Sequence, residues 1–203
     1  MTSRDSISFG SSDQSTLQRV HHLQLFRGLT QCFDIVERHF SQHPDLYRDV
    51  GAIDVVHGLY DQWEQTGRLE LHEIMEAATI TSLAKLMIKN AINHDGHILF
   101  SSSFLHTIQG YLKPPSTPTP TTSVLTVRRE IYHLFNTHLS EAQRRLLLLI
   151  LAHLRRVTTF AKHLTSQVLE LCWLPTIIGI DSLQQYRGLL VLLIDSIAIT
   201  TTT

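Results

Sequence analysis

The sequence predicts an all-α protein, a single domain of eight or nine helices. Apolar residues recur at three- and four-residue spacing along most of the chain, which is the period of an amphipathic helix. No stretch of any length alternates apolar and polar residues as a half-buried strand does, and no internal repeat is present. With 203 residues, of which 43% are hydrophobic and 17% charged, the chain can bury one sizeable core and is not disordered as a whole.

The helical domain is expected over residues 16–203, after a polar N-terminus. Residues 1–15 are rich in Ser, Asp and Thr, which predicts a flexible segment. From 16 to 40 the spacing is helical, either as one helix or as two pieces broken near Gly28. Pro44 ends this region, because the residue before a proline is pushed out of the helical conformation.

Two further helices are predicted over 51–67 and 73–92, followed by a turn at 93–97. The first of them has Asp49 as an expected N-cap, or else Asp54 acting on the helix dipole from the first turn. Its apolar stripe consists of Ile53, Val56, Tyr60 and Trp63. The expected buried side of the second consists of Ile74, Ala77, Ile80, Leu83, Ala84, Met87, Ile88 and Ala91.

A proline-rich segment at 113–122 separates the two halves of the chain. It follows a short helix expected over 100–112 and can be neither helix nor central strand. We interpret it as an exposed loop, and binding to an SH3-like partner in the polyproline conformation is the alternative.

The second half is predicted to contain the buried central helix. A fifth helix is marked by apolar residues at 127, 131, 134 and 135, and a sixth begins at Ser140, which with Gln143 resembles a capping box. Because residues 146–157 are apolar nearly all round, the sixth helix should be the buried one. Another helix is expected from 165 to 172, broken at 173–176, and a last one from 181 to about 199.

The composition predicts a soluble, cytoplasmic protein with no nucleic-acid partner. The formal net charge is −1, so no overall positive field attracts nucleic acid or an acidic membrane. The N-terminus has no apolar signal-peptide core, and the apolar run at 146–154 is shorter than the roughly 18 residues that span a bilayer. Cys32 and Cys172 lie in apolar helical contexts, which favours two free thiols over a disulfide.

The motif content does not predict an enzyme with a complete active site of its own. Among thirteen histidines, the nearest clusters, such as His153 with His163, lack the spacing of a metal site, so neither a metal nor another cofactor is expected. The phosphate-binding patterns G-x-x-x-x-G-K-[ST] and G-x-G-x-x-G are absent, and so is the G-x-S-x-G elbow of hydrolases.

One loop, residues 44–51, which we call the arginine loop, holds an arginine without an arranged acid–base partner. Acid–base catalysis needs a second titratable group within hydrogen-bond reach, and the loop shows no carboxylate or histidine arranged as such a partner of Arg48. A guanidinium that stays charged suits a cation that is delivered to another protein's active site. Lys85 and Lys89 lie one turn apart on the predicted third helix and so project from the same side, which taken alone indicates only a solvated polar face.

These features occur in an order that resembles the Rho GTPase-activating (RhoGAP) domain. The loop D-L-Y-R-D-V-G is similar to the family's G-[IL]-[FY]-R-x-x-G, and S-L-A-K-L-M-I-K is similar to its L-x-K-x-x-[LI]-[RK]. In the second half, L-A-H-L-R-R-V resembles the family's H-L-x-x-V helix, and K-H-L-T-S-Q-V-L-E-L-C-W-L-P-T resembles N-K-M-T-x-x-N-L-A-x-x-F-G-P-N. The likeness covers about residues 25–199.

The resemblance implies that the chain activates a Rho- or Rac-type small GTPase. Arg48 then matches the catalytic arginine finger, Lys85 the lysine beside it, and Lys89 a basic residue at the GTPase interface, while Thr176 stands where the family has an asparagine that engages the GTPase. GTP and Mg²⁺ would be carried by the partner. Asp45 replaces the glycine that opens the family's loop. Two alternatives follow: a domain that binds a GTPase without activating it, or a helical scaffold for unrelated proteins.

Overall fold

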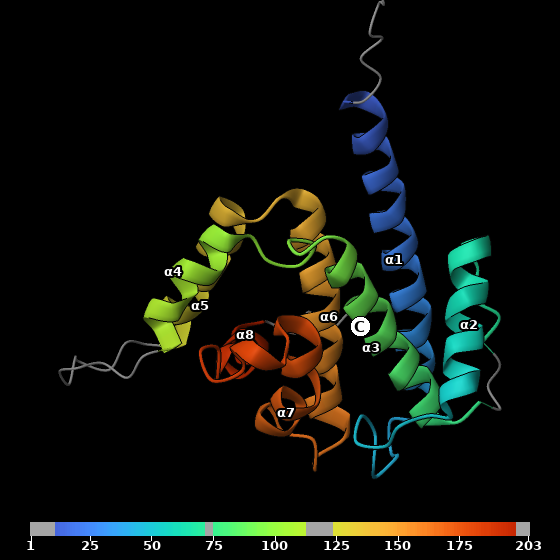
Figure 1. Cartoon of the computed structure of the whole chain (residues 1–203). Coiled ribbons are helices and arrows are strands. Elements are labelled where there is room, and N and C mark those ends of the chain that lie inside the picture. Colours follow the sequence, from blue (N-terminus) through green and yellow to red (C-terminus); the bar gives the residue numbers. More distant parts are fainter. Residues whose placement is uncertain (1–10, 72–74, 113–123, 198–203) are drawn as a thin grey trace, which may run out of the picture.

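The computed structural model describes residues 11–71, 75–112 and 124–197. Within them the fold is all-α, with eight α-helices, one short 3₁₀-helix and no strand (Figure 1). Residues 1–10, Ile74 and the proline-rich segment at 113–122 lie outside the described residues. The elements are α1 (Ser11–His39), α2 (Ile53–Thr66), α3 (Ala77–His94), α4 (Ser102–Leu112), α5 (Val124–His138), α6 (Glu141–Phe160), α7 (Ser166–Ile178), η1 (Ile180–Ser182) and α8 (Leu189–Ser196).

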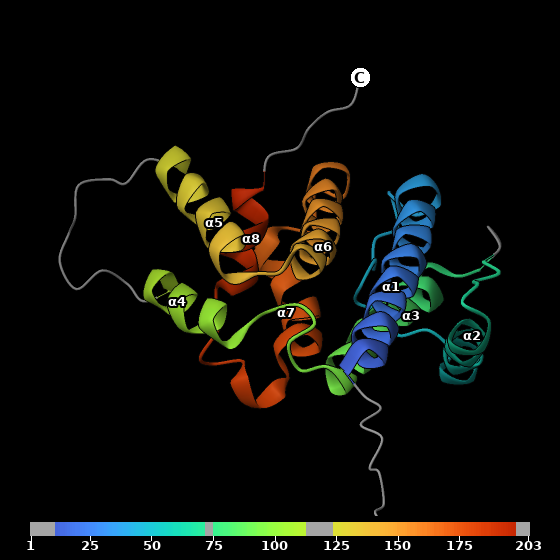
Figure 2. The ribbon, with the colours of Figure 1, turned by 90° about the horizontal axis from the view of Figure 1, so that it is seen from above.

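The helices form two groups joined by α6 and α7. On one side α3 packs against both α1 and α2, and on the other α5 packs against α4 and α8 (Figure 2). Between them α6 contacts α1, α7 and α8, and α7 contacts α3 and α8. The chain segments that matter below, the loop after α1, the middle of α3 and the end of α7, therefore meet on one side of the molecule.

The prediction of a buried central helix is confirmed for α6. Its inward face is fully apolar except for His153, and it consists of Leu146, Leu147, Ile150, Leu151, His153, Leu154 and Val157. The capping box is also present, since Ser140 Oγ accepts a hydrogen bond from the Gln143 backbone N–H and the Gln143 side chain accepts one from the Ser140 N–H. The buried side predicted for α3 is confirmed at each of its described positions, 77 to 91.

The first helix differs from the prediction at its start, and of the two alternatives at Gly28 it takes the unbroken one. It begins at Ser11, five residues before the predicted start at residue 16. It also continues without a break through Gly28, because the glycine serves close packing and not a turn. A Cβ at this position would overlap the Met87 side chain and lie 2.9 Å from Trp63 Nε1, so the missing side chain lets α2 and α3 approach α1.

The predicted break at 173–176 is wrong, because α7 continues through Pro175 to Ile178. A proline inside a helix costs roughly 3 kcal/mol. That cost is offset by burial of the residues on either side of it, since Trp173, Leu174 and Ile177 are all buried. The helix and not the proline therefore sets where Thr176 points.

The predicted last helix, from 181 to about 199, is also wrong in its first half. The chain forms the short helix η1 and turns, and α8 begins only after Gly188, which has φ of 87°. The reason is a cap from a distant residue: the Glu170 carboxylate accepts hydrogen bonds from Gly188 N (2.8 Å) and Val191 N (3.2 Å). A carboxylate at the first turn also complements the helix dipole.

Three smaller expectations have mixed outcomes. The N-cap of α2 is Ala52 and not Asp49, because the loop before it is fixed to α3 by a hydrogen bond from Gly51 N to Ser82 Oγ (3.0 Å); Asp54 does lie in the first turn. Cys32 and Cys172 are both free thiols, as predicted. None of the described helices combines the length and apolar character that crossing a membrane requires.

Candidate functional site

The loop between α1 and α2 turns two residues into the core and the next three outward. Its backbone is folded by hydrogen bonds from Arg48 N and Asp49 N to Asp45 O, at 2.9 and 3.3 Å. Leu46 and Tyr47 are 1% and 2% exposed, whereas Arg48, Asp49 and Val50 are exposed. The buried pair fixes the loop to the protein, and the arginine that follows is therefore presented to solvent.

Tyr47 has a backbone conformation that tyrosine does not adopt without support. Its φ of 70° makes it the only residue other than glycine with a positive φ among the described residues. The left-handed region costs an ordinary residue about 1–2 kcal/mol, so the surroundings of Tyr47 must hold it there. Arg48 follows directly, and its direction is set by this turn.

Lys85 on α3 holds the loop from one side. Its Nζ donates a hydrogen bond to the Tyr47 carbonyl oxygen (2.9 Å) and lies 5.7 Å from the centre of the Tyr47 ring and 5.9 Å from that of Trp173. These are distances at which a cation is attracted by an aromatic face. Burial lowers the pKa of Lys85. The lysine thus holds the backbone of the loop in place, and its side chain is only partly exposed at the surface.

A chain of hydrogen bonds in the interior holds the Tyr47 hydroxyl. The Tyr47 hydroxyl is bonded to His153 Nε2, His153 Nδ1 lies 2.6 Å from Glu37 Oε1, and Arg156 Nε donates to Glu37 Oε2 at 2.8 Å. We call these four residues the tyrosine relay. The Phe33 ring stacks on His153 with 4.0 Å between ring centres. The relay links the loop to α1 and α6.

The protonation states of the relay follow from its surroundings. Burial raises the pKa of Tyr47 and lowers that of His153, the latter against the raising effect of Glu37. The pKa of Glu37 is raised by burial but brought below its ordinary value by hydrogen bonds from His153 and Arg156. A protonated tyrosine therefore donates to a neutral imidazole, whose Nδ1–H donates to a carboxylate.

The four residues singled out from the sequence all line one open groove of about 260 Å³, which we call the arginine groove. Arg48 comes from the loop, Lys85 and Lys89 from α3, and Thr176 from α7. The remaining lining residues are Asp49, Val50, Gly51, Ile53, Val56, His57, Ser82 and Leu86. Residues up to 128 positions apart in the sequence thus share one surface, as the resemblance implies.

The arginine groove carries a net positive charge that this chain does not neutralise. Three basic residues and one acidic residue, Asp49, line it. Within the described part of the chain, the Arg48 guanidinium and the Lys89 ammonium form no hydrogen bond or ion pair, and Asp45 forms no ion pair with Arg48. The arrangement can bind an anion or stabilise negative charge that develops on another molecule.

Gly51 closes the loop against the start of α3. It is buried, and a Cβ there would lie 2.5 Å from Thr79 Cα and 2.8 Å from Thr79 N. Since those are backbone atoms that cannot turn aside, only glycine allows this contact. The last position of the motif D-L-Y-R-D-V-G therefore has a direct steric explanation.

Sequence reasoning did not find the tyrosine relay. In the sequence, His153 and His163 form one of the nearest histidine clusters, whereas the structure buries His153 against Phe33 and leaves His163 exposed. One signal was present: His153 is the single polar residue on the inward face of α6. A buried polar side chain needs a hydrogen-bond partner, but the sequence does not say which residue supplies it.

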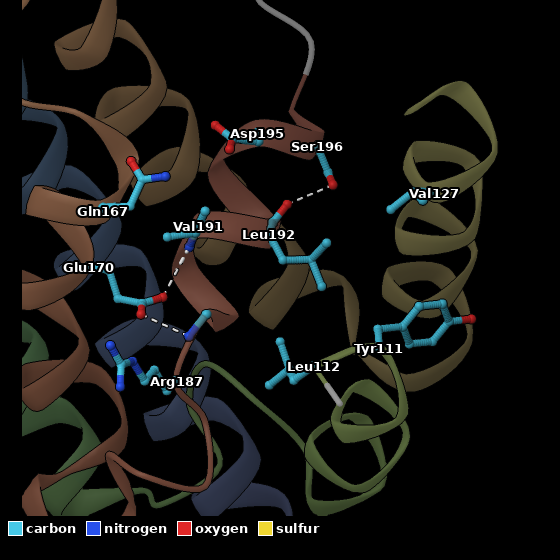
Figure 3. A pocket seen from close by; sticks show the side chains of 11 residues that line it. Tyr111, Leu112, Val127, Gln167, Glu170, Arg187, Val191, Leu192, Asp195 and Ser196 are labelled. Carbon is cyan, nitrogen blue, oxygen red and sulfur yellow. Dashed lines mark hydrogen bonds between the residues drawn. The ribbon is translucent and has the colours of Figure 1, made fainter. Parts of the chain in front are cut away.

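A larger pocket, of about 560 Å³, lies between α4, α5, α7 and α8 (Figure 3). No residue of the loop that holds Arg48 lines it. We call it the α8 pocket. Glu170 in its wall caps α8, and Asp195 accepts hydrogen bonds from Ser166 Oγ (2.7 Å) and from Arg155 (3.3 Å). It contains none of the residues predicted from the sequence, and its lining is Tyr111, Leu112, Val127, Gln167, Glu170, Arg187, Gly188, Val191, Leu192, Asp195 and Ser196.

Comparison with known proteins agrees with this geometry. A family model described as the RhoGAP domain matches residues 27–182. Among solved structures, the chain is similar to the crystal structure of the BH domain from GRAF, the GTPase regulator associated with focal adhesion kinase, with 19% identity and a TM-score of 0.62 over 87% of this chain and 90% of that one. At this identity the likeness shows a shared fold. Comparison with curated proteins gives no match.

Proposed function

The chain belongs to the RhoGAP family, and we propose that it activates GTP hydrolysis by a Rho- or Rac-type small GTPase, supplying Arg48 in trans as an arginine finger. The partner brings GTP, Mg²⁺ and the residue that orients the attacking water. This chain needs no cofactor of its own, and both proteins meet in the cytoplasm. The observation that carries the proposal is an exposed arginine without a partner in the described chain, held at a groove with Lys85, Lys89 and Thr176.

The proposed mechanism is electrostatic. In phosphoryl transfer the catalyst has little covalent work to do, and stabilising charge on the transferring group is the main requirement. An arginine finger supplied by an activating protein accelerates hydrolysis by roughly 10³–10⁵-fold. The buried Tyr47 and the Lys85 hydrogen bond support this role, because a cation that is already oriented needs no reorganisation when the transition state forms.

The other groove residues have separate roles in the proposal. Lys85 positions the loop, Lys89 attracts and contacts the GTPase, and Thr176 contributes a short polar contact from α7. Val50 and Ile53 are 83% and 67% exposed at the rim, which is unusual for such side chains and suits apolar contact with a docked protein. Docking over this rim excludes water from Arg48 and strengthens its interaction with phosphate.

Binding without activation is the second candidate, and it rests on Thr176 and Asp45. Thr176 has a shorter polar side chain than the family's asparagine, and Asp45 places a carboxylate three residues before Arg48. The loop geometry favours activation over this candidate, since the Asp45 backbone carbonyl accepts from Arg48 N and its carboxylate forms no ion pair with the Arg48 side chain in the described residues.

A single-turnover assay separates the two candidates. GTP-loaded GTPases of the Rho, Rac and related types are mixed with the protein, with a Ras-type GTPase as the control. We expect acceleration over intrinsic hydrolysis for at least one Rho- or Rac-type partner and none for the control. Binding to the GTP-bound form with no acceleration would favour the second candidate, and neither binding nor acceleration would remove both.

A further inference from the structure

The inward face of α6 contains one polar residue where an apolar one would be less costly. His153 is fully buried among leucines, isoleucine and valine, and it is the only polar member of that face. A buried polar group costs free energy unless its hydrogen bonds are satisfied. Both ring nitrogens of His153 are satisfied, one by Glu37 from α1 and the other by Tyr47 from the arginine loop.

The order of donors and acceptors in the tyrosine relay has a fixed direction. Arg156 can only donate, so Glu37 receives its N–H on one oxygen and is left with the other oxygen for His153. That carboxylate oxygen holds the proton on His153 Nδ1, which makes Nε2 an acceptor. The acceptor in turn requires the Tyr47 hydroxyl to donate. Each member therefore sets the orientation of the next one.

The relay ends at the residue whose backbone needs support. Tyr47 alone among the described non-glycine residues has a positive φ, and it precedes Arg48 directly. Its ring is held at the hydroxyl by His153 and on its side by Trp173, with 5.2 Å between ring centres in an edge-to-face arrangement. Strain of this kind persists only where the surroundings over-determine the conformation, and it occurs preferentially at functional sites.

We propose that His153 and Glu37 are positioning residues for GTPase activation: through Tyr47 they hold the arginine loop in the turn that presents Arg48 to the partner. This inference rests on the function proposed above. According to this inference, the maximal rate also depends on two residues outside the arginine groove. Neither of them touches the partner. Lys85 fixes the Tyr47 carbonyl, and the relay fixes the hydroxyl at the other end of the same residue.

The variants are chosen to cut the relay at different points. His153→Leu removes both bonds with little change of volume, and His153→Gln leaves a carbonyl that can accept from Tyr47. Glu37→Gln keeps the shape and lies near the surface, so it stays folded even where a buried substitution does not. Its amide N–H₂ meets either the Nδ1–H of His153 or the Nε–H of Arg156, so one link is lost. Tyr47→Phe removes the hydroxyl alone.

The measured quantity is the single-turnover rate of GTP hydrolysis at increasing concentrations of the activating protein. We expect His153→Leu to lower the maximal rate about 10- to 100-fold, the effect of a misplaced catalytic group, while the half-saturating concentration stays nearly unchanged. His153→Gln should keep part of the rate, and Glu37→Gln should lower it less than His153→Leu. The double variant His153→Leu with Tyr47→Phe should have a maximal rate no lower than that of His153→Leu alone, because the effects of substitutions at two residues that act through one hydrogen bond do not add.

The control is Ile131→Val, a fully buried position of α5. This helix lies in the group with α4 and α8, away from α1, α2 and α3 (Figure 2). The substitution loosens the core without touching the loop, and the maximal rate should equal that of wild type. If wild type accelerates hydrolysis and both His153→Leu and Glu37→Gln do so equally well, the positioning role is refuted and the proposed function stands. A change only in half-saturation also refutes it. If wild type gives no acceleration, the proposed function fails and takes this inference with it.

Discussion

The arginine groove and the α8 pocket differ in size and in charge, and the smaller of the two is the better candidate site. The α8 pocket has about 560 Å³ and the groove about 260 Å³. The pocket is lined by two carboxylates and one arginine, and the groove by three basic residues and one carboxylate. The charges of the two linings therefore favour a phosphate-bearing partner at the groove over one at the pocket.

The use of the charged groups separates the regions further. Glu170 and Asp195 in the α8 pocket hold this chain together, one by capping α8 and the other by bonding to Ser166 and Arg155. In the arginine groove, Arg48 and Lys89 are bound to nothing in the described chain. Charged groups that a protein exposes without internal partners indicate binding more directly than the volume of a cavity does.

The largest expected effect is at Arg48. Arg48→Ala should lower the stimulated rate of GTP hydrolysis by roughly 10³–10⁵-fold, because the cation that stabilises the transferring phosphoryl group is removed. Binding to the GTP-bound partner should be largely retained. Single-turnover kinetics measure the rate, and Arg145→Ala, which removes an exposed arginine of α6, is the matched control. A rate for Arg48→Ala equal to that of the control would exclude Arg48 as the finger.

The next effect is at Lys85, which belongs to the groove but serves the loop. Lys85→Met keeps most of the length of the side chain and removes the hydrogen bond to Tyr47 O. We expect the maximal stimulated rate to fall about 10- to 100-fold, since a displaced finger loses most of its effect. The unfolding midpoint should change little in comparison. If only the affinity for the GTPase falls, Lys85 contacts the partner and does not position the loop.

The α8 pocket should respond to substitution in stability and not in activity. Glu170→Ala removes the buried carboxylate that accepts two hydrogen bonds from backbone N–H groups at the start of α8, and hydrogen bonds to charged groups contribute about 1.5–3 kcal/mol each. We expect a free energy of unfolding lower by at least about 3 kcal/mol, and an unchanged stimulated rate well below the melting temperature. Gln167→Ala, an exposed position in the same pocket, is the control for urea unfolding. Loss of activity by a folded Glu170→Ala protein would give this pocket a functional role.

A smaller effect is expected from pH, through the buried histidine beneath the groove. Burial holds the pKa of His153 below its ordinary value of 6.5. A group with a lowered pKa in the folded state stabilises the fold above its unfolded pKa, and that stability is lost as the pH falls through the folded value. The free energy of unfolding should therefore fall on going from about pH 7.5 to about pH 5.5, and His153→Leu should show a smaller fall.

Urea unfolding at the two pH values measures this difference. Ile131→Val changes no titratable group and should follow wild type. An equal fall in wild type and His153→Leu would mean that burial does not disfavour the charged form of His153, which contradicts the direction of its pKa shift.

Local sequence patterns were enough to predict most of the helices and the loop that holds Arg48. Helical periodicity gave the buried side of α3 and the central position of α6, and the capping box gave the start of α6. The motif around Arg48, the lysine pair and the motif that ends at Thr176 gave four residues that the structure brings to one groove, although their roles stay a prediction. In each case the signal lay within a few residues, or in motifs whose order along the chain matches a family.

The misses involve contacts between residues far apart in sequence. Glu37 and His153 are 116 positions apart, and Tyr47 and His153 are 106 apart. Glu170 sets the start of α8 from another helix, and the packing of α7 outweighs the cost of Pro175. No local pattern specifies such partners, because they depend on which faces the folded helices bring together.

The central claim is that Arg48 acts in the partner's active site when the phosphoryl group is transferred. The most direct test is binding to the GTPase loaded with GDP and aluminium fluoride, which mimics that group. Wild type should bind this form at least about 100-fold more tightly than the GDP form, as expected for a transition-state mimic. Arg48→Ala should lose that preference and keep its affinity for the GTP form. Equal preference in wild type and Arg48→Ala would contradict the account.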